Sequence, residues 1–233
     1  MESKGKKQNT YQVNHFLMIP FEDETFVQEY IKMQEKLITE NPDGFDKELL
    51  QKPGKLHMTI TILSLDMDET KVKQVETLLN GIQEEIKKLS ESSINFSFEK
   101  FDTMGPKDQA RVVYGKMVED DSFYKLSQVI DLIIKTLVDA GFIDKNKLAE
   151  NHIEYINGKY SITLHLTLLN VTFWNKILKK QKKKPKKNFD ANAIMNSISG
   201  VQLPPCKLNK FNFCVMREDK KTEKYELVKS YEL

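Results

Sequence analysis

The chain has 233 residues, with 36 Lys and Arg against 34 Asp and Glu, so its net charge is +2. Its length suits one large domain or two small ones, and a hydrophobic fraction of 39% is enough to fold. Two cysteines exclude a disulfide scaffold, and no apolar run approaches the roughly 18 residues of a membrane helix. The near-neutral total argues against a surface built entirely for nucleic acid.

Residues 1–10 are polar and lysine-rich and lack an apolar stretch, so we predict a flexible basic tail rather than a secretory signal. The rest of the chain, residues 11–233, is predicted to form a single domain. Within it, residues 179–187 (KKQKKKPKK) form a low-complexity basic insertion.

The predicted elements alternate along the chain. Helical periodicity after Asp23 is carried by Phe26, Tyr30, Met33 and Leu37. A second helix over 68–88 has Asp68 as its N-cap. A third is capped by Ser122 or Asp121 and stopped by Gly141, and 189–198 forms a short fourth helix. Strands are predicted over 13–21, 55–63, 94–101, 111–118, 162–171, 208–216 and 224–231. Segregated hairpins favour an α+β fold over a doubly wound parallel sheet.

The most informative pattern occurs twice. Residues 56–60 (LHMTI) and 164–168 (LHLTL) match in type and lie 108 positions apart. Side chains alternate along a strand, so His57, Thr59 and Thr61 are expected on one face, and His165 and Thr167 on the corresponding face of the second strand. The opposite faces would be apolar, formed by Leu56, Met58, Ile60, Ile62, Ile162, Leu164, Leu166 and Leu168.

Two histidines that face one cleft suit acid–base chemistry. The unperturbed pKa of imidazole is near 6.5, so one ring can be neutral and the other protonated at physiological pH. The neutral ring would accept a proton from a hydroxyl or water, and the protonated ring would give one to a leaving oxygen. Thr59 and Thr167 could donate to phosphate oxygens between the rings. The scheme needs no metal or cofactor, and no His, Cys, Asp and Glu cluster has zinc spacing.

His-x-Thr followed by a hydrophobic residue, present twice and about a hundred residues apart, resembles the two-histidine (2H) phosphoesterase superfamily. Residues 14–20 (NHFLMIP), 55–59 (KLHMT), 189–191 (FDA) and 208–209 (LN) are similar to one branch of it. That branch holds the phosphoesterase-like domains of activating signal cointegrator 1 complex subunit 1 and A-kinase anchor protein 7. The segment 189–233 is more similar to the cointegrator subunit.

The resemblance implies a bilobal α+β fold, with two antiparallel sheets related by a pseudo-two-fold axis around a central cleft and flanked by helices. It implies a phosphodiesterase that acts on RNA-type ends or oligonucleotides, such as 2′,3′-cyclic phosphates or 2′,5′ linkages. His57 and His165 would be the acid–base pair, and Thr59 and Thr167 the phosphate-binding residues. Cointegrator subunits carry an RNA-binding KH domain ahead of this one, and no Gly-x-x-Gly loop precedes it in this chain.

Other residues are candidates for contact with the substrate. Lys55, Lys159 and Tyr160 lie next to the two motif strands, and Trp174 could stack on a base or pack in the core. His15 is expected to be a structural histidine. His152 is expected to be exposed, and the thiols of Cys206 and Cys214 are expected to be buried.

The lysine run 179–187 leaves three interpretations open. It could steer a phosphate-rich substrate, act as a nuclear localisation signal, or be a solvated, mobile insertion. The resemblance predicts a nuclear protein, an RNA or oligonucleotide substrate, subunits of a coactivator or helicase repair complex as partners, and no membrane.

Two further hypotheses use the same residues. The cleft could hold a nucleotide or RNA end without cleaving it, as a binding module in a transcription-coactivator or DNA-repair assembly. Alternatively, the domain could be an interaction scaffold whose motifs are covered by a loop.

Overall fold

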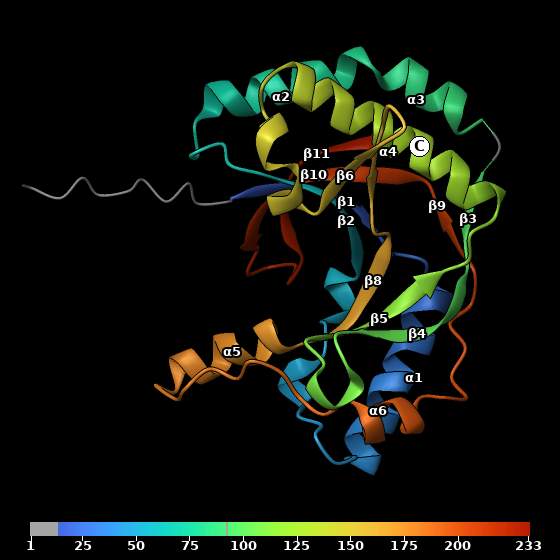
Figure 1. Ribbon diagram of the computed structural model, residues 1–233, viewed down its shortest axis with the longest axis vertical. Helices are drawn as coiled ribbons and strands as arrows, with labels where there is room; N and C mark the ends of the chain where they lie inside the picture. The colour runs from blue at the N-terminus through green and yellow to red at the C-terminus, as the bar shows by residue number, and fades with distance from the viewer. Residues whose placement is uncertain (1–13, 92) are drawn as a thin grey trace, which may run out of the picture.

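The computed structural model describes residues 14–91 and 93–233 (Figure 1). The predicted basic tail, residues 1–10, lies outside this range. Two antiparallel sheets form the framework. The first has the order β11-β10-β1-β2 and the second β4-β5-β8. The strands of the two sheets are β1 His15–Pro20, β2 His57–Leu63, β10 Lys210–Glu218, β11 Tyr225–Glu232, β4 Phe98–Met104, β5 Val112–Met117 and β8 His165–Asn170.

Two short antiparallel pairs complete the strands. β3 (Ile94–Phe96) pairs with β9 (Cys206–Leu208), and β6 (Ile153–Ile156) pairs with β7 (Lys159–Ile162). The sequence did not indicate the β6–β7 hairpin, and the predicted strand 162–171 is therefore divided between β7 and β8. Short 3-10 helices connect several elements: η1 Lys47–Leu49, η2 Pro53–Lys55, η3 Lys107–Gln109 and η4 Lys145–Asn151.

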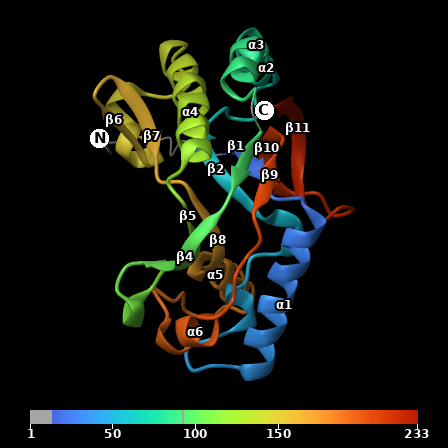
Figure 2. The ribbon, with the colours of Figure 1, turned by 90° about the vertical axis from the view of Figure 1, so that its right-hand side faces the viewer.

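The helices gather in two groups. α2, α3 and α4 cover the sheet of β1 and β2, while α1, α5 and α6 lie beside the sheet of β8 (Figures 1 and 2). The helices are α1 Glu24–Glu40, α2 Glu69–Gly81, α3 Gln83–Leu89, α4 Asp121–Asp139, α5 Val171–Lys180 and α6 Asn192–Ser197. Among the described residues, no helix is both long and apolar enough to cross a bilayer.

The first helix forms as its sequence predicts. The Asp23 carboxylate accepts a hydrogen bond from the Phe26 backbone N–H at 2.9 Å and so caps the helix. The predicted stripe of Phe26, Tyr30, Met33 and Leu37 is buried. Full burial of a large apolar side chain is worth about 1.5–3 kcal/mol, so the stripe fixes α1 against the core.

Two helical details differ from the prediction. The predicted helix 68–88 is two helices, because the chain leaves helical geometry at Ile82, just after Gly81. Glycine is about 1 kcal/mol less favourable than alanine inside a helix. The N-cap of α4 is Asp120, not Asp121 or Ser122, since its carboxylate accepts from the Phe123 N–H at 3.0 Å.

Candidate functional site

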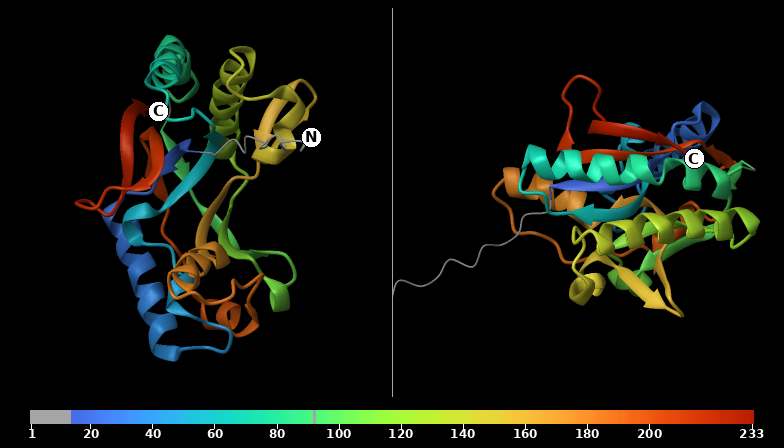
Figure 3. Two further views of the ribbon diagram at one scale, coloured as in Figure 1. Left: turned by 90° about the vertical axis from the view of Figure 1, so that its left-hand side faces the viewer. Right: turned by 90° about the horizontal axis from the view of Figure 1, so that it is seen from above.

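The two motif strands are terminal strands of different sheets and lie side by side. β2 ends the order β11-β10-β1-β2, β8 ends the order β4-β5-β8, and the two are in contact (Figure 3). Hydrogen bonds also connect β8 to the loop that precedes β2 and to helix α1. The Gln51 N–H donates to the Leu168 carbonyl at 2.8 Å, and the Tyr30 hydroxyl donates to the carbonyls of Gln51 at 2.8 Å and Leu168 at 3.2 Å.

Both strands carry a β-bulge at the same position of the motif. In β2, Thr59 pairs with Met18 and Thr61 with Leu17, so Ile60 is the extra residue. In β8, Thr167 pairs with Tyr114 and Leu169 with Val113, so Leu168 is the extra residue. A bulge re-aims the side chains that follow it. The two copies of the motif therefore agree in backbone irregularity as well as in sequence.

Beyond the motif, the bulge turns side chains to the opposite face from the one that strict alternation predicts. His57 and Thr59 are half-buried, as strict alternation requires, but Thr61 is buried and Ile62 is half-buried. β8 has the same pattern, with half-buried His165 and Thr167. Because the extra residue reverses the alternation, each strand offers only one histidine and one threonine ahead of the bulge, and Thr61 does not extend the polar face.

The two imidazole rings are held in matching ways. Nδ1 of His57 donates to the Lys55 carbonyl at 2.7 Å, and Nδ1 of His165 donates to the Thr163 carbonyl at 2.8 Å. A carbonyl can only accept, so Nδ1 carries the hydrogen in both rings. Each neutral ring therefore has its lone pair on Nε2. That nitrogen is the one available for proton transfer.

Aromatic side chains pack against both imidazole rings. His57 makes edge-on contacts with Phe16 and Tyr225, with centroid distances of 5.5 Å and 5.4 Å. His165 makes an edge-on contact with Tyr114 at 5.5 Å. No local pattern points to Tyr225, which lies 168 positions from His57. Tyr114 stands opposite Thr167 because β5 pairs with β8, and the sequence did not predict that pairing.

The electrostatics of the pair differ from the prediction of one neutral and one charged ring. Burial, with smaller contributions from the charges of His165 and Lys55, lowers the pKa of His57 to about 4, although its hydrogen bond to the Lys55 carbonyl acts in the opposite direction. Burial also lowers the pKa of His165, with a contribution from the charge of His152. Both rings are therefore neutral near pH 7 while no anion is bound.

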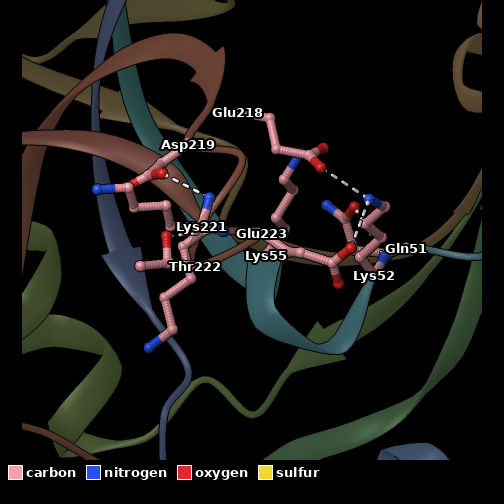
Figure 4. A network of polar contacts seen from close by, with 9 residues as sticks. Gln51, Lys52, Lys55, Glu218, Asp219, Lys221, Thr222 and Glu223 are labelled. Atoms are coloured by element: carbon pink, nitrogen blue, oxygen red, sulfur yellow. Dashed lines mark hydrogen bonds and ion pairs between the residues drawn. The ribbon is translucent and has the colours of Figure 1, made fainter.

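Of the further candidates, Lys55 lies at this site. Its side chain is only 12% exposed and its ammonium lies 5.0 Å from the centroid of the Tyr225 ring. It forms an ion pair with Glu218, which also binds the Lys52 ammonium at 2.9 Å (Figure 4). These hydrogen bonds lower the pKa of Glu218 to about 2, so the carboxylate stays charged.

No hydrogen bond or ring contact among the described residues joins Lys159, Tyr160 or Trp174 to His57 or His165, so their contact with the substrate stays a prediction. Lys159 is exposed on β7. Tyr160 is buried in the core, where its ring packs on Tyr155 at 4.7 Å. Trp174 packs against the core and its ring lies 5.5 Å from the Lys186 ammonium.

The remaining histidines and cysteines lie where the sequence predicts. His15 is buried in β1 and its Nδ1 bonds the Asn14 side-chain oxygen at 2.7 Å, as expected of a structural histidine. His152 is exposed. Burial raises the pKa of Cys206 to about 11 and of Cys214 to about 12, so neither thiol is a nucleophile.

The lysine run is attached to α5 rather than inserted after it. Lys179 and Lys180 form the last turn of the helix. The chain then turns back, and Asn175 exchanges two hydrogen bonds with the backbone of Lys186, at 2.7 and 2.8 Å. All residues of 179–187 are exposed.

Known proteins share this fold. A family described as AKAP7 2'5' RNA ligase-like domain matches residues 13–233, whereas no curated protein sequence matches the chain. Similar solved structures include E. coli LigT complexed with 3'-AMP, at 14% identity and a TM-score of 0.51 over 95% of this chain and 98% of that one. TT0787 of Thermus thermophilus has 14% identity and a TM-score of 0.52 over 94% and 97% of the two chains. Kluyveromyces marxianus Usb1 with uridine monophosphate has 12% identity and a TM-score of 0.51 over 96% and 99%.

These matches confirm the predicted resemblance to the 2H phosphoesterase superfamily and the predicted α+β fold. The matching family is named for the anchor protein of the predicted branch. The greater similarity to the cointegrator subunit stays a prediction.

Proposed function

Because the chain belongs to the AKAP7 2'5' RNA ligase-like domain family of 2H phosphoesterases, we propose that it is a phosphodiesterase that acts on RNA-type phosphodiesters through His57 and His165. Its substrates are 2′,3′-cyclic phosphate ends or 2′,5′- or 3′,5′-linked oligonucleotides. Neither proton transfer requires a metal ion, because each can be made by an imidazole.

One observation supports the proposal: the two motifs agree in the anchor of the histidine, the burial of the threonine and the position of the bulge. Each histidine is anchored through Nδ1 to the carbonyl two residues before it. Each is followed at the second position by a half-buried threonine and then by a bulge. Two strands that only filled space would not need this agreement at the polar positions.

The reaction uses the two Nε2 atoms in opposite senses. One neutral imidazole accepts the proton of the attacking water or ribose hydroxyl, whose oxygen forms the new bond to phosphorus. The other ring, protonated, gives its proton to the ribose oxygen as the old phosphorus–oxygen bond breaks. The hydroxyls of Thr59 and Thr167 donate to the non-bridging oxygens and stabilise the charge that develops there.

The reaction needs one protonated ring, and the negative charge of the substrate favours that protonation. Burial favours neutral rings in the empty cleft, and an anion between them favours the imidazolium form of one ring. His57 is the better candidate for the base, since burial lowers its pKa to about 4 and so keeps it neutral. His165 is then the acid.

Single-residue variants test the proposal. His57→Ala and His165→Ala should each lose turnover by at least about a hundredfold, the lower end of general acid–base contributions, on a panel of oligonucleotides with cyclic-phosphate ends and 2′,5′ or 3′,5′ linkages. Thr59→Val and Thr167→Val should raise KM and lower kcat. His152→Ala is the matched control, because His152 is exposed. Full activity in either motif-histidine variant contradicts the mechanism, as does loss of activity in EDTA.

The binding-module alternative has a different signature. A silent module would bind nucleotides by calorimetry and show no turnover of any member of the panel. Such a result would assign Thr59 and Thr167 to anion binding and leave the histidines without a catalytic role.

Nuclear localisation and membership of a coactivator or helicase repair complex are finer proposals. The first is supported by the lysine run 179–187, which is exposed throughout. Replacing Lys182, Lys183 and Lys184 by alanine in a fluorescent fusion should move the protein out of the nucleus. The second rests on the predicted likeness to the cointegrator subunit, and co-purification with such a complex from cells tests it.

A further inference from the structure

A basic groove of about 540 Å³ opens beside His57. Its walls come from four segments that are distant in sequence: helix α1, the loop 47–55, helix α5, and the β10–β11 hairpin. The groove shares residues with the candidate site. Lys55 lines it and also accepts the Nδ1 hydrogen bond of His57 through its carbonyl. Tyr225 lines it and also contacts the His57 ring. A substrate chain that leaves the histidine pair on this side therefore enters the groove.

The lining of the groove is strongly positive. Five lysines and two glutamates give it a net charge of +3, and we call it the lysine groove after these residues: Lys47, Lys52, Lys55, Lys176 and Lys180. The charges interact. Partial burial of the Lys176 ammonium lowers its pKa, and the charge of Lys55 lowers it further. Like charges held this close cost free energy, and a bound anion would recover it.

A carboxylate occupies part of this positive field. Glu218, at the end of β10, accepts hydrogen bonds from Lys52 and Lys55 with its two oxygens (Figure 4). Two cations arranged around the two oxygens of one acid make the same set of contacts that a phosphate would receive. The hairpin that carries Glu218 lies against the loop 47–55, since Lys52 also approaches Glu223 at 3.9 Å.

We propose that the lysine groove binds a second phosphate of an oligonucleotide whose scissile phosphate lies between the two histidines, with Glu218 holding the place of that phosphate in the empty enzyme. Phe173, half-buried in the wall of the groove, offers its ring to the adjoining base. The inference rests on the proposed function and narrows it. The substrate is an oligonucleotide with at least two phosphates, in preference to a mononucleotide with a cyclic phosphate.

Two substrates of one linkage test the inference. A dinucleotide has only the scissile phosphate, whereas the matched trinucleotide has a second one. The wild-type protein should cleave the trinucleotide with a kcat/KM about tenfold higher, the effect of one charged hydrogen bond. Lys176→Glu should abolish this length advantage. Lys179→Glu is the matched control, since it makes the same charge change on the same helix outside the groove. Glu218→Gln should lower the KM of the trinucleotide, because the competing carboxylate is gone.

The outcomes separate this inference from the proposed function. Equal kcat/KM for the two substrates in the wild-type protein, or equal losses in the two lysine variants, overturns the groove assignment. If the wild-type protein cleaves no member of the substrate panel, the proposed function fails, and fluorescence anisotropy of labelled di- and trinucleotides decides the groove. Tighter binding of the trinucleotide that Lys176→Glu removes and Lys179→Glu keeps supports the groove, and length-independent binding overturns it.

Discussion

Acid should destabilise the fold through His57. Burial lowers the pKa of this ring from 6.5 to about 4. Between these two values the unfolded chain binds a proton at position 57 that the folded protein excludes. The free energy of unfolding therefore falls as the pH falls from 6.5 toward 4. Above pH 6.5 the ring is neutral in both states and contributes no pH dependence.

The size of the effect follows from the shift. At 1.36 kcal/mol per pKa unit, the full loss well below pH 4 is about 3.4 kcal/mol. Lowering the pH from about 7.5 to about 5 should remove about 2 kcal/mol of it. Urea unfolding, followed by circular dichroism at the two pH values, measures the loss directly.

The variant His57→Gln isolates the contribution of this ring. Its own cost to stability does not depend on pH, so it cancels when the two pH values are compared. The variant should lose about 2 kcal/mol less than the wild-type protein over the same interval. His152→Gln, at an exposed histidine, should behave like the wild-type protein. An unchanged pH dependence in His57→Gln would refute the assignment of a buried, neutral ring.

Three further predictions concern the site and the fold. The pH profile of kcat/KM should be bell-shaped with its maximum below pH 6.5, because both free-enzyme imidazoles have lowered pKa values; an optimum at neutral or alkaline pH would contradict this. Gly115→Ala should lower the free energy of unfolding by about 1–3 kcal/mol, since a Cβ there would lie 2.6 Å from the packed ring of Phe98. Chemical denaturation measures this loss, and an unchanged midpoint would show that the Phe98 ring moves aside freely. Asp120→Ala should cost about 1 kcal/mol through loss of the α4 cap, whereas Asp120→Asn should retain most of the stability in the same assay.

The sequence predicted the elements that carry strong periodicity. The stripe of α1 and the caps Asp23 and Asp68 are found as expected. The two His-x-Thr strands were also predicted, because apolar residues alternate with the His and Thr in the same way in both copies. The β6–β7 hairpin was not predicted, since only its Asn157-Gly158 turn distinguishes it from a polar connection.

Other features depend on contacts that no local pattern carries. The bulges at Ile60 and Leu168 arise from register with β1 and β5, so strict alternation placed Thr61 wrongly. The lysine groove combines four distant segments. The low pKa of His57 comes from burial. The predicted pair of one charged and one neutral ring assumed solvent-like surroundings, and that assumption fails where aromatic rings enclose an imidazole.

The hydroxyl of Tyr30 has a consequence for the precision of the chemistry. It donates to the carbonyl of Gln51, on the approach to β2, and to that of Leu168 within β8. One phenol thus connects the segment before β2, which carries His57, to β8, which carries His165. Transfer of two protons across a single phosphorus atom tolerates errors of only about an ångström. Alignment of the two proposed catalytic strands therefore involves a buried side chain of α1 that lies outside both motifs.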